Sequence, residues 1–253
     1  SLRVLCLSNN QLSGSIPEGI GNAVNLDQLF LQNNQLSGGI PESLGEVPSL
    51  KLIYLDNNQF SGTFPENILK PLLREITLND NYFISVPNLS SYSLLSIYKI
   101  ENNQLEFDCI ESNMSLDTID EFTYSPQDSV NIAIDTTVSK NSTIQFNTSV
   151  GGTANQYQWY HNQIPISGAI DSVLIMNSVQ AEDEGLYTCA ITNSLVPDLA
   201  LWRRNIHLQV DTSNAINENG INTISVYIKN KQLIIDNINA DCRLSIYTVQ
   251  GNH

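Results

Sequence analysis

Residues 26–36 read LDQLFLQNNQL, and residues 2–12 read LRVLCLSNNQL. The same eleven-residue pattern, Leu-x-x-Leu-x-Leu-x-x-Asn-x-Leu with Ile, Tyr or Phe at some Leu positions, returns at 50–60, 73–83 and 95–105. Its asparagine recurs every 22 to 24 residues, as Asn10, Asn34, Asn58, Asn81 and Asn103. A unit this short cannot bury its apolar residues alone, so the five units must stack into one continuous core. The pattern therefore predicts a solenoid.

Each unit begins with a short segment in which apolar and variable residues alternate. In residues 28–32, QLFLQ, the alternation places Leu29 and Leu31 on one side and the residues between them on the other. Such alternation is typical of a strand, and stacked copies would align as a parallel sheet. The asparagine follows the strand, where the chain must turn. Because a buried amide can satisfy backbone groups that the coil leaves unpaired, we expect a structural role for the five asparagines.

The segments that follow the asparagines share a second pattern. Residues 12–17, 36–41 and 60–65 read LSGSIP, LSGGIP and FSGTFP. With these tails the stretch resembles the plant-type subfamily of leucine-rich repeats, which implies a solenoid of five repeats over residues 1–110. Residues 106–110 break the pattern and are predicted to begin a cap, and residues 111–128 are predicted to hold its remainder and a linker. Because the chain opens inside a repeat, we expect a leader and earlier repeats to precede Ser1 in the full protein.

The residues that face outward from the repeat strands form the candidate binding surface, since a solenoid presents a concave face that its own core does not need. The predicted ligand-binding residues are Gln28, Phe30, Gln32, Leu52, Tyr54, Asp56, Thr77, Asn79 and Lys99. Phe30 and Tyr54 should be neighbours about 5 Å apart across two strands. They predict a recognition patch for a protein or for the face of a sugar ring. The alternative is that the two rings merely pack on each other.

Residues 129–210 change to short alternating strands separated by turn-rich segments. The phrase DEGLYTC at 183–189 and the Trp159-Tyr160 pair resemble an immunoglobulin-like domain. That resemblance implies a β-sandwich in which Tyr187 bonds back to the backbone. The partner cysteine expected before the Trp is missing, with Phe146 at or near its place. We therefore predict a core of Phe146, Trp159, Leu174 and Tyr187 around a free Cys189.

After a polar linker at 211–222, residues 223–253 contain three further alternating runs, at 224–228, 233–235 and 244–246. Their order resembles the C-terminal sorting domain of the type IX secretion system of certain bacteria. The resemblance implies a small β module, here incomplete, that engages the secretion machinery. Ile-Lys-Asn stands where that family has Pro-Asn-Pro after the Tyr. The alternative is an incomplete third β-domain with no sorting role.

Charge and cysteine placement exclude several functions. The formal net charge is −15 and no segment is basic, which argues against nucleic acid and against anionic membrane surfaces as partners. No run of 18 apolar residues is present, so we expect no direct membrane insertion. Cys6 and Cys109 would lie roughly 20 Å apart along the predicted sheet, beyond the reach of a disulfide. Cys189 and Cys242 fall in separate predicted modules, so no disulfide is expected.

The sequence contains no recognisable catalytic or metal-binding motif. His161, His207 and His253 are isolated from any nucleophile motif or metal spacing. The acidic residues 182–184 are interpreted as a solvated turn and not as a calcium site. No glycine-rich phosphate loop follows a strand. We therefore predict a protein that is not an enzyme and uses no cofactor.

These observations predict a multidomain, mainly β protein: a leucine-rich-repeat solenoid, an immunoglobulin-like sandwich and a small incomplete all-β module. The favoured function is non-catalytic recognition of a protein or carbohydrate ligand, by a bacterial protein that is secreted or attached to the cell surface. Two alternatives stay open. The chain is either a structural adhesin whose repeats only extend its reach, or the non-catalytic tail of a larger secreted hydrolase.

Overall fold

The computed structural model describes residues 2–115, 119–212, 223–229 and 232–236, the last two ranges as backbone only. The chain divides into two compact units. Unit 1 consists of residues 1–128 together with 151–154 and 193–200, and unit 2 of 129–150, 155–192 and 201–253. Among the described residues, no helix has the length and apolar character needed to cross a bilayer.

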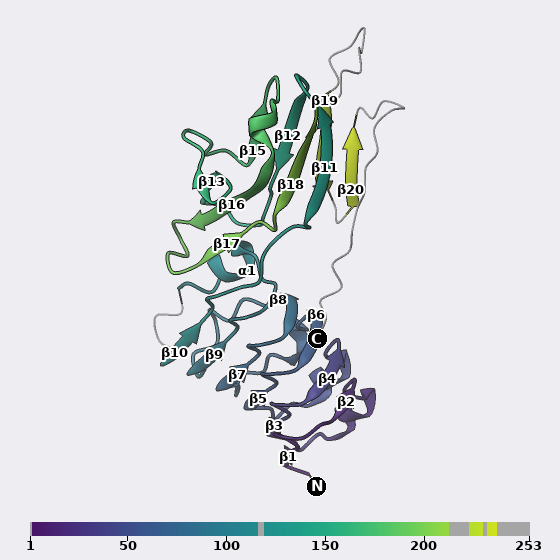
Figure 1. Cartoon of the computed structure of the whole chain (residues 1–253). Helices are drawn as coiled ribbons and strands as arrows, with labels where there is room; N and C mark the ends of the chain where they lie inside the picture. Colours follow the sequence, from purple (N-terminus) through teal and green to yellow (C-terminus); the bar gives the residue numbers. More distant parts are fainter. Residues whose placement is uncertain (1, 116–118, 213–222, 230–231, 237–253) are drawn as a thin grey trace. The chain divides into compact units, whose positions relative to one another are not determined.

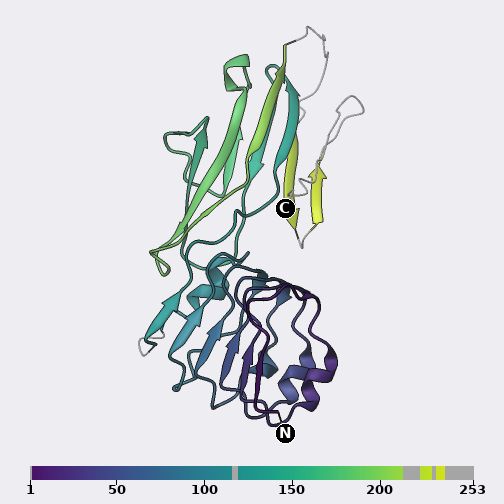
Figure 2. The ribbon, with the colours of Figure 1, turned by 60° about the horizontal axis from the view of Figure 1, so that its bottom comes forward.

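Unit 1 is a solenoid whose main sheet has six parallel strands in chain order (Figures 1 and 2). The strands are β1 (Val4–Cys6), β3 (Gln28–Phe30), β5 (Leu52–Tyr54), β7 (Glu75–Thr77), β9 (Ile97–Lys99) and β10 (Glu121–Thr123). Equivalent positions of successive repeats pair directly, for example Leu29 with Ile53 and Ile53 with Ile76. The parallel sheet predicted from the alternation is therefore confirmed, with one strand more than the five repeats supply.

The other side of each coil carries shorter elements. A second sheet contains β2 (Ser13–Gly14), β4 (Gln35–Gly38), β6 (Gln59–Thr63) and β8 (Tyr82–Ser85). Three 3₁₀ helices follow the prolines of the tails: η1 (Glu18–Asn22), η2 (Glu42–Glu46) and η3 (Glu66–Ile68). Figure 2 shows these helices on the side away from the main sheet. Helix α1 (Phe107–Glu111) follows the fifth repeat and buries Phe107 and Ile110.

The asparagines that end each strand join neighbouring coils. The side-chain amide of Asn81 donates to the carbonyl oxygens of Leu55 and Leu78, at 3.0 and 3.1 Å, and its oxygen accepts from the backbone N–H of Phe60 at 2.9 Å. Asn34, Asn58 and Asn103 repeat this arrangement one coil apart. Asn58, Asn81 and Asn103 are at most 8% exposed. The predicted structural role of the asparagines is confirmed.

The sixth strand belongs to a rung in which Gln127 replaces the asparagine. Its amide donates to the carbonyl oxygens of Ile100 and Tyr124, at 2.8 and 2.7 Å, and its oxygen accepts from the N–H of Leu105 at 3.3 Å. Gln127 follows Asn103 by 24 residues, within the range of the other repeats. The solenoid sheet therefore continues into residues 111–128, where the sequence predicted only the remainder of a cap and a linker.

Unit 2 is a β-sandwich. One sheet has the order β11 (Ile134–Ser139), β18 (Ile206–Asp211), β16 (Gly185–Asn193), β13 (Asn155–His161) and β14 (Ile164–Pro165), with β17 (Ala200–Trp202) paired to β16. The other has the order β15 (Val173–Met176), β12 (Thr143–Asn147), β19 (Thr223–Lys229) and β20 (Gln232–Asp236). The immunoglobulin-like fold predicted for residues 129–210 is confirmed in its sandwich architecture.

The core of the sandwich is the predicted one. Trp159 is fully buried, and the ring of Phe146 lies 6.4 Å from that of Trp159 and 5.2 Å from that of Tyr187. The hydroxyl of Tyr187 donates to the carbonyl oxygen of Asp183 at 2.7 Å, which is the corner hydrogen bond implied by the resemblance. Cys189 is a fully buried free thiol. An apolar cluster therefore occupies the place of a disulfide.

The C-terminal segment continues the second sheet. Strand β19 pairs in parallel with β12, and β20 pairs antiparallel with β19. The first two alternating runs predicted after the polar linker therefore coincide with strands, and β20 is the edge strand of this sandwich sheet. The third run, at 244–246, and Cys242 lie outside the described residues. The assignment of residues 223–253 to a separate module stays a prediction.

The buried amides predict a large loss of stability when one is removed. We expect Asn81→Ala to lower the free energy of unfolding by about 2–4 kcal/mol, because the substitution leaves one N–H and two carbonyl groups of the buried backbone without that partner. Gln59→Ala, which truncates an exposed amide beside the ladder, should change it by less than about 0.5 kcal/mol. Urea denaturation of both variants measures the difference. Equal losses would contradict the role of the ladder.

Candidate ligand-binding surface

The nine predicted binding residues lie on the outward face of the main sheet or directly after its strands, a surface called the sheet face below. Phe30, Tyr54, Thr77 and Lys99 form one column of directly paired positions, and Gln28 and Leu52 belong to the column before it. Gln32, Asp56 and Asn79 follow their strands by two residues. Thr77 is buried and the other eight are partly exposed. The strand register therefore brings residues of four repeats together on one surface.

A hollow of about 360 Å³ lies in this face. Six of the predicted residues line it, and the other three, Gln28, Phe30 and Leu52, do not. Its lining is completed by Asn33, Ile97 and Glu101 and contains Gln32, Tyr54, Asp56, Thr77, Asn79 and Lys99. The hollow therefore draws side chains from the second to the fifth repeat. It is a groove across coils and not a cavity inside one.

The aromatic pair at the edge of the hollow has a defined geometry. The ring centroids of Phe30 and Tyr54 lie 5.0 Å apart, with an angle of 83° between the ring planes. This edge-to-face contact is the favourable one for aromatic rings. The rings pack on each other, as the alternative interpretation held, and both still keep part of their surface exposed.

Hydroxyl groups of the sheet face donate to carboxylates of neighbouring repeats. The phenol of Tyr54 donates to Glu75, and the hydroxyl of Thr77 donates to Asp56 at 2.5 Å. Burial of the phenol, its hydrogen bond to Glu75 and the charges of Glu75 and Asp56 raise the pKa of Tyr54 to about 12. Neighbouring coils are therefore coupled through polar side chains as well as through the backbone.

The sixth strand supplies residues that the sequence-based prediction missed. The ammonium group of Lys99 lies 2.7 Å from the carboxylate of Glu121, and the hydroxyl of Thr123 donates to Glu101 at 2.5 Å. The hydrogen bond to Glu121, with the further charges of Glu121, Glu101 and Asp56, raises the pKa of Lys99. The spacing of 24 residues from Asn103 to Gln127 was the signal that could have found this strand.

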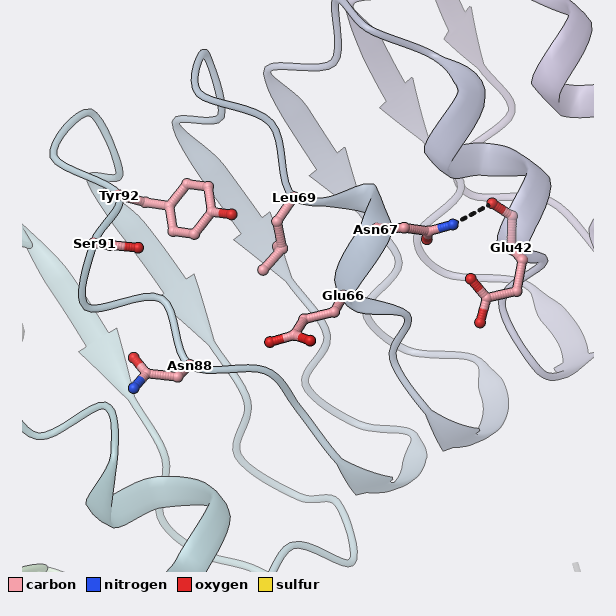
Figure 3. A pocket seen from close by; sticks show the side chains of 7 residues that line it. All are labelled: Glu42, Glu66, Asn67, Leu69, Asn88, Ser91 and Tyr92. Carbon is pink, nitrogen blue, oxygen red and sulfur yellow. Dashed lines mark hydrogen bonds between the residues drawn. The ribbon is translucent and has the colours of Figure 1, made fainter.

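A second hollow lies on the opposite side of the solenoid, beside η2 and η3 (Figure 3). It is lined by Glu42, Glu66, Asn67, Leu69, Asn88, Ser91 and Tyr92. The amide of Asn67 donates to the backbone carbonyl oxygen of Glu42 at 3.0 Å, which joins two successive coils. The carboxylates of Glu42 and Glu66 do not converge on one point (Figure 3). This hollow is wide and open. Its lining residues also include Leu69, whose N–H donates to the carbonyl oxygen of Glu66 at 3.1 Å, and both hydrogen bonds are structural.

The described residues contain no group of three or more His, Cys, Asp or Glu side chains that could hold a metal ion. In the acidic turn, Asp183 accepts from the N–H of Gln180 at 2.8 Å, and Glu184 accepts from the N–H of Val210 at 2.8 Å. These two carboxylates therefore fix the backbone of the turn.

Comparison with known families agrees with both units. Residues 1–23, 25–47 and 49–70 match the family model described as Leucine Rich Repeat, and residues 125–193 match the one described as Immunoglobulin domain. The chain carries leucine-rich repeats and an immunoglobulin-like domain. No curated protein matches the sequence.

Several solved structures are similar to part of this chain. The complex of PEPR1 with AtPEP1 is 27% identical over 55% of this chain and 19% of that chain, with a TM-score of 0.46. The ectodomain of the Arabidopsis thaliana receptor kinase GASSHO1/SCHENGEN3, in complex with CASPARIAN STRIP INTEGRITY FACTOR 2, is 23% identical with the same coverage and a TM-score of 0.45. The ectodomain of the Arabidopsis thaliana receptor kinase SOBIR1 is 26% identical over 47% of this chain and 67% of that chain, with a TM-score of 0.42. The chain spans about a fifth of the first two.

The environment of Tyr54 predicts a shift that titration can measure. Because burial and two nearby carboxylates disfavour the phenolate, Tyr54 should stay protonated at pH 10–11, where exposed tyrosines ionise. Glu75→Gln should lower the pKa of Tyr54 toward 10 by removing the negative charge beside it. NMR titration with ¹³Cζ-labelled tyrosine, with the signal assigned through Tyr54→Phe, gives both values. An unchanged pKa in the Glu75→Gln protein would contradict this coupling.

Proposed function

We propose that the leucine-rich-repeat unit is a non-catalytic recognition module that binds a segment of another protein on the sheet face. The observation that carries this proposal is the groove across four repeats, with the aromatic pair of Phe30 and Tyr54 at its edge. Partly exposed aromatic side chains beside polar groups are typical anchors of protein interfaces. The proposed binding residues are the nine predicted ones, joined by Glu75, Ile97, Glu101, Glu121 and Thr123.

The size of the sheet face favours a peptide-like segment. Six strands about 4.8 Å apart and about five residues deep give a surface of roughly 400–500 Å². A standard interface between folded proteins buries about 800 Å² on each partner. An extended segment laid across the strands needs less area, so it fits the described face better than a folded domain does.

The aromatic geometry favours protein over carbohydrate. A sugar ring stacks on an open aromatic face, and two coplanar rings would offer a platform. Here the planes of Phe30 and Tyr54 are at 83°, so the edge of one ring meets the face of the other. The pair is therefore better suited to hold an apolar or cationic side chain between strands than to lie flat under a pyranose.

We further propose that the protein acts outside the cell, with the immunoglobulin-like domain as a spacer and residues 223–253 as the signal for type IX secretion. The support is the order of alternating runs in that segment, two of which form β19 and β20. The structural adhesin and the hydrolase tail remain the rival functions. The adhesin alternative, in which the repeats only extend the reach of the protein, predicts a sheet face that binds nothing.

The export proposal predicts that removal of residues 213–253 stops secretion. In a bacterium with type IX secretion, the full protein should reach the medium or the cell surface, and the shortened protein should accumulate in the periplasm. Protease resistance of the periplasmic material shows whether the shortened chain is folded. Secretion of folded, shortened protein at the full level would contradict the sorting role.

The recognition proposal predicts that peptides selected by this protein need the aromatic pair. We would pan a phage-displayed library of random twelve-residue peptides on the immobilised protein and measure the affinity of enriched peptides by fluorescence anisotropy. Phe30→Ala/Tyr54→Ala should weaken binding at least about tenfold, since each buried anchor contributes on the order of 1–2 kcal/mol. Tyr82→Ala, which truncates an exposed aromatic residue of β8, should change it less than about twofold.

Circular dichroism and thermal unfolding show whether the variants are folded. If the alanine variant is unfolded, Phe30→Leu/Tyr54→Leu keeps apolar bulk on the strands and should still lower affinity by removing the rings. The proposal is rejected if no peptide is enriched, or if enriched peptides bind the folded variant as tightly as the original protein.

A further inference from the structure

We infer that the segment bound on the sheet face presents a cationic side chain, with arginine the best fit, to the carboxylates of the hollow. This inference rests on the proposed function and adds the chemical class of the ligand. It follows from three features of the face: its hydroxyl donors are already bonded to carboxylates, its charges are mainly negative, and an aromatic ring lies beside the hollow.

The hydroxyl donors of the sheet face are already used within it. The hydroxyls of Tyr54, Thr77 and Thr123 donate to Glu75, Asp56 and Glu101 respectively. The ammonium group of Lys99 is paired with Glu121. A ligand rich in acceptors, such as a carboxylate or phosphate, would have to break one of these contacts to gain a hydroxyl donor, and it would stand beside the carboxylates of Asp56 and Glu101 that line the hollow.

The acceptors of the face are only partly used. A carboxylate offers about four lone-pair sites, so one or two hydrogen bonds leave each of these groups able to accept more. The side-chain oxygens of Gln32 and Asn79, two residues that line the same hollow, are buried and accept no hydrogen bond from any described residue. The NH2 group of Asn79 donates to the carboxylate of Asp80 at 2.7 Å. This hydrogen bond identifies the other terminal atom of the side chain as the unpaired oxygen. Acceptor capacity therefore remains in the hollow for a ligand that brings donors.

The charges of the face also favour a cationic ligand. Four carboxylates, those of Asp56, Glu75, Glu101 and Glu121, stand on the face with the single ammonium group of Lys99. Other basic groups lie at the edge where the strands begin, outside the lining of the hollow: Arg3 and Lys51 both approach Asp27, at 2.8 and 3.9 Å. A cation that enters the hollow meets the carboxylates of Asp56 and Glu101, which line it, while the charge of Lys99 there is paired with Glu121.

Arginine satisfies these features better than lysine does. Its planar guanidinium carries five N–H donors and can bond two carboxylate oxygens at once. It also stacks on aromatic rings, and Tyr54 both lines the hollow and belongs to the aromatic pair. An ammonium group offers three donors without the planar fork, so it should bind less tightly at the same place.

The test uses three fluorescein-labelled peptides, acetyl-(Gly-Arg)₄-amide, acetyl-(Gly-Gln)₄-amide and acetyl-(Gly-Glu)₄-amide, with the full chain in 50 mM NaCl. We expect the arginine peptide to bind at least about tenfold more tightly than the other two, and to weaken steeply between 50 and 300 mM NaCl. Asp56→Asn/Glu101→Gln should weaken its binding at least about tenfold. These substitutions keep an oxygen that can accept from Thr77 and Thr123.

The matched control removes the same number of charges from the other side of the solenoid. Glu42→Gln/Glu66→Gln alters exposed carboxylates of the second hollow (Figure 3) and should change the affinity less than about twofold. Equal weakening by both double variants would show attraction to the net charge only, and would overturn the inference. An arginine peptide that binds no better than the glutamine peptide would also overturn it.

The selected library peptides separate this inference from the proposed function. If those peptides depend on Phe30 and Tyr54 but contain no excess of arginine or lysine, the recognition function stands and the cationic ligand is rejected. If no library peptide depends on the aromatic pair, the recognition proposal falls with the inference that rests on it.

Discussion

The interaction on which the rest of the solenoid depends is the buried amide that ends each strand. One asparagine, such as Asn81, joins the carbonyl of its own coil to the carbonyl and the N–H of the coil before it. Each such group is buried and would be costly to leave unpaired, so the amide allows successive coils only one register. Leucine burial drives the stacking, but a layer of leucines alone would tolerate a slip between coils. The amide does not.

The sheet face is a consequence of that register. Because equivalent positions of successive repeats are paired, side chains that are 22 to 24 residues apart in the sequence become direct neighbours. All three hydroxyl–carboxylate bonds of the face join adjacent repeats: Tyr54 with Glu75, Thr77 with Asp56, and Thr123 with Glu101. The ladder thus fixes the spacing of the coils, and the polar contacts of the face then orient the side chains at that spacing.

The same reasoning shows which features the sequence could predict. The repeat spacing is visible in the sequence itself. It predicts the strands, the columns of paired positions and the contact between Phe30 and Tyr54. In the sandwich, the core around Cys189 followed from the DEGLYTC phrase, because a single residue pattern specifies both the corner and the packing of Tyr187. The sixth rung was hidden because Gln127 substitutes for asparagine and Phe122 and Tyr124 for the aliphatic residues. Which hydroxyl donates to which carboxylate depends on rotamers, which no residue pattern encodes.

The internal hydrogen bonds also bear on how a face of this kind can bind. A carboxylate held by a hydroxyl of a neighbouring coil has lost rotamer freedom during folding, so a ligand does not have to pay for ordering it again. The hydroxyl also partly solvates the charge, so several like charges can stand on one face without a bound ion between them. A hollow built in this way has its acceptors in place before any ligand arrives. Its preference for a ligand that brings donors then follows from these carboxylates and from the hydroxyls already bonded to them.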